Sequence, residues 1–395
     1  MKILVLFYGV FGVEYTLFEM EGERELARGI IEGIGTKTAI NTYKYPDGET
    51  EHTVKEVSNP VSAIKWILHT LTSKTVIKNV EEIDAIGHRV IHGGTKYSRA
   101  TIINNEVLND VVDFSDLAPE HNPFNAQGIK ASSQVFPSTP QVAVFDTAFY
   151  STLKPEVYLY GLPYQFYTQY GIRKYGFHGI GHLCAAVEVS KLIHRSLKRM
   201  RIISLHIGRG SSITAIDKGE AVDTSMGFSP TGGLLMKTRC GDIDPLIVIY
   251  LAAKENLSLI GVENILNKNS GILGLAGTTS LKELAEKAEK GEKRAVCALN
   301  AFVYRIQKYF GGYYVSMGGV DAFVLTSRDD DSVPLIRSKI IKKLEFLGLK
   351  LDEKKNEKCC DKTMEISTRN SKVKIFFVPR NEELCIARET KEVVK

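Results

Sequence analysis

Charged and imidazole side chains lie at the ends of several apolar segments and beside glycine turns. His88 and Arg89 follow one apolar segment, Asp146 ends another, and His206 precedes the glycine turn GRGSS at 208–212. Such places hold ligands in α/β proteins because backbone N–H groups there can approach phosphates. An arginine guanidinium binds carboxylates and phosphates through two parallel hydrogen bonds. These residues therefore favour an oxyanion site, with a surface salt bridge as the alternative role for the arginine.

Four more polar residues occupy comparable places. His121 precedes a predicted helix, and His178 lies in a tight turn, GFHG. Arg239 lies in a loop, and Glu382 begins the last predicted helix. As for Arg89, the placement of Arg239 near glycine turns favours oxyanion binding, and a surface salt bridge is the alternative.

Three histidines and one aspartate have simpler interpretations. The spacing of His178 and His182 would suit a metal pair, but the glycines at 179 and 181 make a regular helix there doubtful. His88 lies beside a strand, where packing or a buried hydrogen bond is the more common role. A single aspartate at a strand end, such as Asp146, is often a turn or cap residue.

Standard nucleotide-binding motifs are absent from the sequence. There is no GxxxxGK[ST], and the segment GGLLMKT at 232–238 lacks the glycine before its lysine. No predicted strand leads through GxGxxG into a helix. Any phosphate site must therefore be built from other turns.

The elements that position these residues alternate between strands and helices, which predicts an α/β fold with mixed sheets flanked by helices. The first forty residues are interpreted as short strands, and residues 352–362 as charged and less ordered. A domain border is placed near residue 150. The predicted strands are 3–7, 15–20, 83–88, 142–145, 322–325 and 373–378, and the predicted helices are 61–71, 123–136, 244–254, 258–267, 280–317, 334–347 and 382–394.

An internal repeat is visible in the sequence. The segment from Lys2 to Gly9 aligns with the segment from Arg201 to Gly208 at a constant offset of 199 residues. Each has a basic residue, an apolar strand and a glycine turn. The repeat predicts two similar domains, each opening with a hairpin; two unrelated hairpins are the alternative.

Composition limits the class of protein. A chain of 395 residues suggests two or three domains. It has 51 Lys and Arg against 46 Asp and Glu, a formal charge of +5, and 44% hydrophobic residues. No apolar stretch reaches the ~20 residues of a membrane span, and no basic block dominates. Nucleic acid and membranes are therefore not expected partners.

The cysteines indicate a reducing compartment, and we predict a cytoplasmic protein. None of the six belongs to a CxxC pair, so a structural zinc site is not expected. They are Cys184, Cys240, Cys297, Cys359, Cys360 and Cys385.

Long motifs, taken in order, resemble those of the acetate kinases, in the superfamily of acetate and sugar kinases, Hsp70 and actin. The resemblance implies two actin-like ATPase domains: residues 1–148 with 381–395, and residues 149–380, the second binding nucleotide. The motifs are HRVIHGG (88–94), LAPEHNPFNAQGI (117–129), VAVFDTAFY (142–150), YGFHGIGH (175–182), LHIGRGSSITAI (205–216), VDTSMGFSPTGGLLMKTRCGDIDP (222–245), NKNSGILGL (267–275), YYVSMGGVDAFVLTS (313–327) and VPRNEELCIARET (378–390).

The resemblance implies reversible transfer of the ATP γ-phosphate to acetate, giving acetyl phosphate and ADP, with Mg²⁺ or Mn²⁺ and in a homodimer. By position, the implied catalytic residues are Arg89, His121, Asp146, His178 and Arg239. Those that would bind acetate are Arg89, Ile91, Phe177 and Pro230; those that would bind nucleotide are His206, Gly208, Arg209, Gly210, Ser211, Asp321 and Thr326; and Glu382 would support the metal.

The sequence departs from the family pattern in the loops around the nucleotide. The first hairpin, usually NAGSSSxK, is FYGVFGVE at 7–14, so Phe7 replaces an asparagine and Glu14 a lysine. Lys237 replaces a glycine, and the adenosine segment TAGIGEN is TSRDDDS at 326–332. Lost hydrogen-bond donors and added negative charge predict weaker ATP binding.

Two alternatives to an acetate kinase stay open. A propionate or butyrate kinase is one, although Glu120, where the acyl pocket usually has leucine, disfavours longer chains. A catalytically impaired or non-catalytic relative with degraded loops is the other.

Overall fold

The chain divides into two compact units in the computed structural model, which describes residues 1–10, 12–45, 47–328, 331, 333–359 and 362–395. The first unit is Met1–Ser151 with Asn381–Lys395, and the second is Thr152–Arg380. The sequence departures at Phe11, Asp329, Asp330 and Ser332, and the cysteine at 360, lie outside the described residues.

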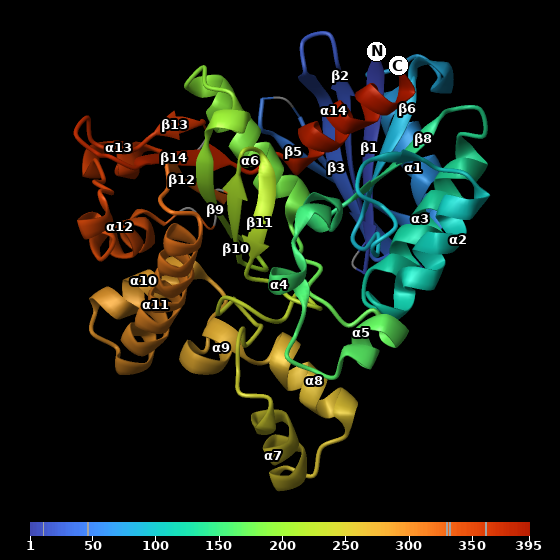
Figure 1. Cartoon of the computed structure of the whole chain (residues 1–395). Helices are drawn as coiled ribbons and strands as arrows, with labels where there is room; N and C mark the ends of the chain where they lie inside the picture. Colours follow the sequence, from blue (N-terminus) through green and yellow to red (C-terminus); the bar gives the residue numbers. More distant parts are fainter. Residues whose placement is uncertain (11, 46, 329–330, 332, 360–361) are drawn as a thin grey trace. The chain divides into compact units, whose positions relative to one another are not determined.

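The first unit is built on an eight-stranded sheet in the order β5-β4-β3-β2-β1-β6-β8-β7 (Figure 1). Strands β1, β6 and β8 run parallel, and the other neighbours pair antiparallel. The strands are β1 (Lys2–Gly9), β2 (Gly12–Glu19), β3 (Arg24–Glu32), β4 (Thr36–Lys44), β5 (Thr50–Val57), β6 (Ala85–Val90), β7 (Thr101–Ile102) and β8 (Gln141–Phe145).

Helices pack on both faces of this sheet. Leu4, Leu6 and Tyr8 of β1 belong to the core formed with α1 (Pro60–Ser73) and α3 (Asn122–Val135). Side chains alternate between the faces of a strand, so Phe7 and its neighbour on β6, Arg89, share the other face. That face is covered by α14 (Glu382–Val394), which crosses β1, β6 and β8 (Figure 1).

Close approach of α14 depends on a glycine. A Cβ at Gly87 of β6 would lie 2.4 Å from Thr390 Oγ1 and 2.8 Å from Ile386 Cγ2. Both partners are on α14, so a larger residue would displace the helix from the sheet. Gly87 thus keeps the start of α14, with Glu382, near the carboxyl end of β6. The first unit also contains α2 (Asn105–Asp113).

The second unit has a six-stranded sheet in the order β11-β10-β9-β12-β14-β13. Its strands are β9 (Arg201–Ile207), β10 (Ser212–Asp217), β11 (Glu220–Thr224), β12 (Ala322–Ser327), β13 (Met364–Glu365) and β14 (Lys374–Pro379). Its helices are α4 (Pro155–Tyr158), α5 (Tyr164–Tyr170), α6 (Gly179–Leu192), α7 (Leu246–Lys254), α8 (Leu259–Lys268), α9 (Gly271–Ala276), α10 (Leu281–Glu289), α11 (Lys293–Ser316), α12 (Pro334–Lys342) and α13 (Glu353–Lys358).

The two sheets share one topology, which supports two similar domains. In each, an opening hairpin is followed by two parallel strands and an antiparallel edge strand. The register agrees as well, because Ile3 pairs with Ala85 and Ile202 pairs with Ala322. Ile3 and Ile202 differ by the offset of 199 residues found in the sequence. The predicted fold of mixed sheets flanked by helices is confirmed.

Three details of the predicted elements are wrong. A regular helix, α6, begins at Gly179 despite its two glycines, and the helix expected over 280–317 is two helices that meet near Gly291. The segment expected to be less ordered contains α13, which Asp352 caps by accepting from Lys355 N. No helix in the described part of the chain is long and apolar enough to cross a membrane.

Candidate functional site

An ion-pair cluster centred on Arg89 lies at the carboxyl ends of β6 and β8. Arg89 Nη2 is 2.6 Å from Asp146 Oδ2, and Arg89 Nη1 is 3.0 Å from Glu382 Oε2. The arginine side chain is 10% exposed, and the carboxylates are 1% and 3% exposed. Burial acts to lower the pKa of Arg89, but Asp146, Glu382 and Glu14 outweigh it and raise that pKa. Arg89 is therefore a permanent cation between two buried carboxylates.

The first hairpin forms one wall of this cluster. Its strands pair from Lys2 with Glu19 to Gly9 with Gly12, so the hairpin forms despite its unusual residues. The Phe7 ring lies over the Arg89 guanidinium, 4.8 Å from Cζ to the ring centroid, in cation–π geometry. Glu14 pairs across the hairpin with Phe7. The two departures from the family pattern thus lie beside Arg89.

Two buried asparagines of α3, which the sequence analysis did not single out, hold the chain around this cluster. Asn125 Oδ1 accepts from Ile91 N at 3.1 Å, and its Nδ2 donates to Tyr8 O at 2.8 Å. Asn122 accepts from His92 N at 3.1 Å and donates to His92 O at 2.9 Å. Both belong to the HNPFN motif, and the two hydrogen bonds of Asn125 connect the end of β1 to the segment after β6. His121, the residue before α3, is half-buried.

His88 has the structural role that its position favoured. Its Nε2 is 2.7 Å from Gln141 Oε1, and burial lowers the pKa of His88 to about 4. His92 is also buried, and its pKa is lowered to about 4 by the same cause. Both rings are therefore neutral near pH 7 and do not serve as charged groups.

In the second unit, basic side chains converge on the turn between β9 and β10. A Cβ at Gly210 would lie 2.8 Å from Arg239 Nη1 and 3.4 Å from His178 Nε2. A Cβ at Gly208 would lie 3.3 Å from His206 Nε2 and 3.6 Å from Arg380 Nη1. Two arginines and two histidines therefore surround backbone that lacks side chains, which is an arrangement suited to an oxyanion.

The loop carrying Arg239 is held by backbone hydrogen bonds. Met236 N donates to Arg239 O at 3.1 Å, closing a tight turn. Asp242 Oδ1 accepts from Gly233 N at 2.7 Å, and Asp242 Oδ2 accepts from the Tyr309 hydroxyl of α11 at 2.6 Å. Asp242 thus anchors the loop to a long helix and fixes the origin of the Arg239 side chain.

Two of the sequence departures in the second unit bind each other. Lys237 Nζ is 2.5 Å from Asp331 Oδ1, and these side chains are 20% and 9% exposed. Lysine stands where the family pattern has glycine, and the aspartate lies in the altered segment 326–332. The family pattern TAGIGEN has glutamate at position 331, so the lysine is the charge that this sequence adds beside an acidic group.

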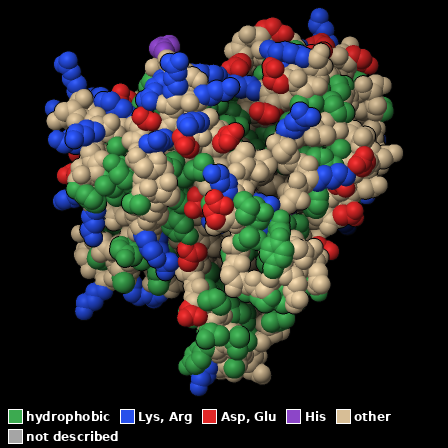
Figure 2. Space-filling model, in the orientation of Figure 1, with side chains coloured by type: hydrophobic (Ala, Val, Ile, Leu, Met, Phe, Trp, Pro, Cys, Tyr) green, Lys and Arg blue, Asp and Glu red, His purple; other side chains and the backbone are tan. Residues whose placement is uncertain are grey.

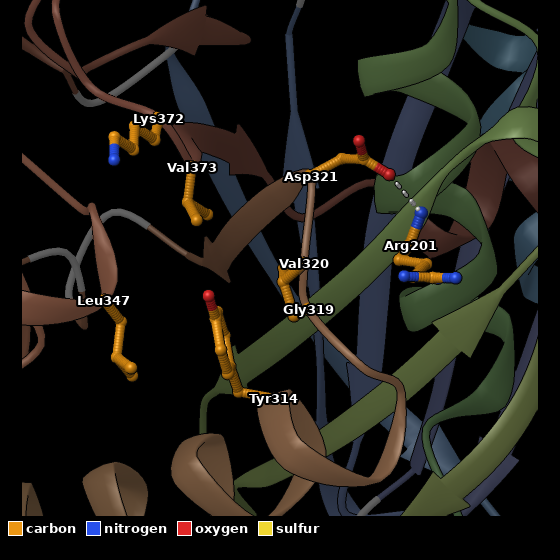
Figure 3. Close-up of a pocket in the computed structure, with 8 residues that line it drawn as sticks. All are labelled: Arg201, Tyr314, Gly319, Val320, Asp321, Leu347, Lys372 and Val373. Carbon is orange, nitrogen blue, oxygen red and sulfur yellow. Dashed lines mark hydrogen bonds between the residues drawn. The ribbon is translucent and has the colours of Figure 1, made fainter.

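The structure does not bring Asp321 to the other predicted nucleotide residues. Asp321 precedes β12 and pairs with the start of β9, where its Oδ2 accepts from Arg201 N at 2.8 Å and its Oδ1 accepts from Arg195 at 3.1 Å. Thr326 lies near the other end of β12, opposite His206. A pocket of about 290 Å³ adjoins Asp321 (Figure 3). Its other lining residues are Arg201, Tyr314, Gly319, Val320, Leu347, Lys372 and Val373.

The other residues implied by the resemblance belong to one unit or the other. Ile91 is in the first unit, and Phe177 and Pro230 are in the second. Ile91 and Phe177 are 7% and 2% exposed, whereas Pro230 is half-buried. Ser211 is buried within the turn and Arg209 is exposed on it.

No cluster of three or more His, Cys, Asp and Glu side chains suited to a metal was found in the described ranges. Asp146 and Glu382 nevertheless place two buried carboxylates side by side against one guanidinium. Magnesium is commonly bound by one or two carboxylates together with substrate phosphates. The donor set therefore fits a divalent cation that arrives with a phosphate ligand.

A duplicated mixed-sheet fold with a basic glycine turn in one unit and a buried carboxylate–arginine cluster in the other defines a phosphate-handling enzyme of the two-domain kinase class. The acetokinase family profile matches residues 2–388. The chain belongs to the acetokinase family.

Individual relatives are similar to this protein along its whole length. It is 44% identical over 398 residues to the acetate kinase of Halothermothrix orenii, with 100% of both chains covered. The crystal structure of Porphyromonas gingivalis acetate kinase has a TM-score of 0.96 at 39% identity, covering 100% of both chains. A propionate kinase from Francisella tularensis has a TM-score of 0.91 at 35% identity, covering 99% of both chains.

Proposed function

We propose that this protein is an acetate kinase that transfers the γ-phosphoryl group of ATP reversibly to acetate. A carboxylate oxygen of acetate forms a bond to the γ-phosphorus, and the bond from that phosphorus to the bridging oxygen breaks, giving acetyl phosphate and ADP. The proposal is carried by full-length membership of the acetokinase family together with the Arg89–Asp146–Glu382 cluster.

The chemistry suits this set of side chains. Phosphoryl transfer depends mainly on alignment and on positive charge at the equatorial oxygens. Acetate is ionised at neutral pH, so no strong general base is needed. Arg239 and His178, beside Gly210, would hold the transferring phosphoryl, and Arg89 would bind the acetate carboxylate or the same phosphoryl. His121 is proposed to contact the transferring phosphoryl. Ile91, Phe177 and Pro230 are proposed to line the site of the acetate methyl.

Nucleotide and metal are assigned from the same arrangement. His206, Gly208, Arg209, Gly210, Ser211 and Thr326 would bind ATP or ADP, and Asp321 is left out because it lies at the opposite end of β12. Glu382 and Asp146 would hold Mg²⁺ or Mn²⁺, which neutralises phosphate charge when bound. We further propose that the acetate kinase domains are residues 1–148 with 381–395, and residues 149–380. A cytoplasmic location stays a prediction.

Steady-state assays in both directions test the proposed function. Acetate should be preferred to propionate and butyrate, because Glu120, which is half-buried, stands where the acyl pocket of the family usually has leucine. A higher kcat/KM for propionate or butyrate would show that this acid, and not acetate, is the preferred substrate. Lack of turnover with all three acids would favour the non-catalytic alternative.

Replacing Arg239 with alanine should lower kcat by about 10²–10³ with little change in thermal stability. The loop around it is held by backbone bonds and by Asp242, which the substitution leaves in place. The measurement is kcat with acetate and Mg·ATP, alongside thermal denaturation. Arg199→Ala, which removes an exposed arginine from the same unit, is the matched control. A parental kcat in Arg239→Ala would show that Arg239 does not act in the catalytic site.

We also propose a homodimer formed through the outer surface of α7 and α8. None of the residues of α7 is buried, although its sequence is LIVIYLAAK. Its Leu246, Ile249 and Tyr250 are 69%, 66% and 62% exposed, and Leu259 and Ile260 of α8 are 83% and 69% exposed. Figure 2 shows hydrophobic side chains gathered over these helices. A contiguous exposed apolar surface is typical of a protein interface.

Light scattering should give twice the chain mass of 43.9 kDa at micromolar concentration. Ile249→Asp combined with Ile260→Asp should give the single-chain mass, because buried charges oppose association. The control is Val315→Asp, at an exposed site on α11. A parent protein that stays at 43.9 kDa across this range would contradict the dimer.

A further inference from the structure

A chain of three hydrogen bonds runs inward from His178 to the centre of the second sheet. His178 Nδ1 is 2.9 Å from Ser212 Oγ, and the same oxygen is 2.8 Å from His182 Nε2. His182 Nδ1 is in turn 2.9 Å from Ser204 Oγ. His182, Ser204 and Ser212 are all 0% exposed. The acetate kinase assignment gives no role to these three residues.

Each of the three hydrogen bonds needs one hydrogen, and two patterns remain when both rings are neutral and the Ser212 hydroxyl donates to one of its two histidines. In the first, Ser204 donates to His182 Nδ1, His182 Nε2–H donates to Ser212, and Ser212 donates to His178 Nδ1. In the second, every donor and acceptor is exchanged, so that His178 Nδ1–H donates to Ser212 and His182 Nδ1–H donates to Ser204. A neutral His178 carries its hydrogen on Nε2 in the first pattern and on Nδ1 in the second.

Ser204, at the buried end of the series of hydrogen bonds, favours the first pattern. In the part of the chain that the structure describes, the Ser204 hydroxyl has no hydrogen-bond partner other than His182. The second pattern would leave its hydrogen buried without an acceptor. An unsatisfied buried donor disfavours an arrangement by about tenfold or more. Burial also disfavours a charged imidazolium at His182.

The outer end of the chain favours a neutral His178. Its Nε2 faces the same space beside Gly210 as Arg239 Nη1. The His178 ring also stacks on that of His206, with centroids 4.3 Å apart. A second positive charge beside the guanidinium would be repelled, whereas a neutral ring with an Nε2–H still donates a hydrogen bond.

The backbone supports a fixed ring. His178 has φ of 61°, in the left-handed region, immediately before α6. A non-glycine residue is uncommon there and is held by its surroundings. The bond to Ser212 provides such a restraint and sets the direction in which Nε2 points.

We propose that Ser204, His182 and Ser212 are positioning residues that hold His178 as a neutral Nε2–H tautomer, ready to donate to the transferring phosphoryl group. The donor-to-acceptor direction of the three hydrogen bonds sets the tautomer of His178, and Ser204 sets that direction. The phosphoryl as acceptor rests on the proposed function, whereas the tautomer itself does not.

Nitrogen chemical shifts of the full-length protein, labelled with ¹⁵N in histidine, test the tautomer directly. The His178 signals are identified by their loss in a His178→Gln variant. A long-range ¹H–¹⁵N spectrum at mildly alkaline pH should then show that Nδ1 of His178 is unprotonated and Nε2 is protonated. A His178 protonated on Nδ1 would overturn the proposal.

Ser204→Ala separates positioning from mere packing. The Nδ1–H form of His178 should become several-fold more populated, and kcat should fall by about two- to tenfold with KM for acetate unchanged. Ser204→Thr, which keeps the hydroxyl, should restore the Nε2–H form. The matched control is Thr224→Val, which removes a buried hydroxyl that bonds to Thr214 on the neighbouring strand. It should leave the His178 signals unchanged.

The possible outcomes are distinct. A lower melting temperature in Ser204→Ala with an unchanged His178 tautomer would overturn the positioning role. If Ser204→Ala does not fold, the spectrum of the unaltered protein still decides the tautomer. A protein with the Nε2–H tautomer but no acetate kinase activity would refute the proposed function while supporting the tautomer.

Discussion

Arg89→Ala should lower kcat for acetate phosphorylation by about 10²–10³, because it removes a charge-assisted contact made in the transition state. It should also destabilise the first unit. Asp146 and Glu382 are both nearly inaccessible to solvent and both bind this guanidinium. Removing one partner of a buried ion pair typically costs about 3–5 kcal/mol. Steady-state kinetics and thermal denaturation measure the two effects.

A matched series separates the effect on stability from that on catalysis. Arg89→Lys keeps the charge but loses the planar fork, so it should retain most of the stability and still lose activity. Arg89→Ala combined with Glu382→Gln should recover part of the lost melting temperature, because one buried negative charge is removed. Near-parental kcat in Arg89→Ala would show that this arginine does not act on the reacting groups.

Restoring residues 7–14 to the family-like sequence NAGSSSVK should strengthen Mg·ATP binding by about 10²–10⁴, as expected for the recovery of two hydrogen bonds to charged groups. The structure adds two local reasons. Phe7 covers one face of the Arg89 guanidinium, and Glu14 adds negative charge near it. An asparagine and a lysine would uncover that face and invert that charge.

Calorimetry with Mg·ATP measures the change. Glu14→Gln alone removes the charge without restoring donors, so it should recover a smaller part of the affinity. The hairpin should be retained in both variants, since β1 and β2 pair along their full length. Micromolar ATP binding by the unaltered protein, with no gain on restoration, would contradict the prediction.

The sequence predicts the fold wherever apolar residues follow a regular pattern. Both opening hairpins were predicted because apolar runs flank glycine turns. The strand β5 was not, because nearly all of its residues are exposed and no apolar face marks it. Pairing with β4 supplies its stability instead. Order around α13 also comes from tertiary contacts, since buried Asn356 accepts from Arg337 Nε at 2.6 Å.

Candidate site residues were found through long motifs, but their contacts were not. Arg89 and Glu382 are far apart in sequence, and nothing local predicts that they form an ion pair. Ser204 was missed because its strand is largely apolar, and Ser212 was noticed only as part of the glycine turn GRGSS. A serine and a histidine within the buried strand RIISLHI were the available signal, since buried polar groups require partners. The spacing of His178 and His182 was noticed but was interpreted only for metal binding.

The Lys237–Asp331 ion pair makes the evolutionary history of these two positions interdependent. Reverting Lys237 alone to glycine would leave the Asp331 carboxylate, 9% exposed, without the cation that now lies 2.5 Å away. The family pattern has glutamate at position 331, so the acidic group is common to both sequences and the lysine is the charge that was gained. The cost of returning to glycine at position 237 therefore depends on the residue at position 331. Because of this epistasis, a lineage that has gained the lysine returns to glycine only with difficulty.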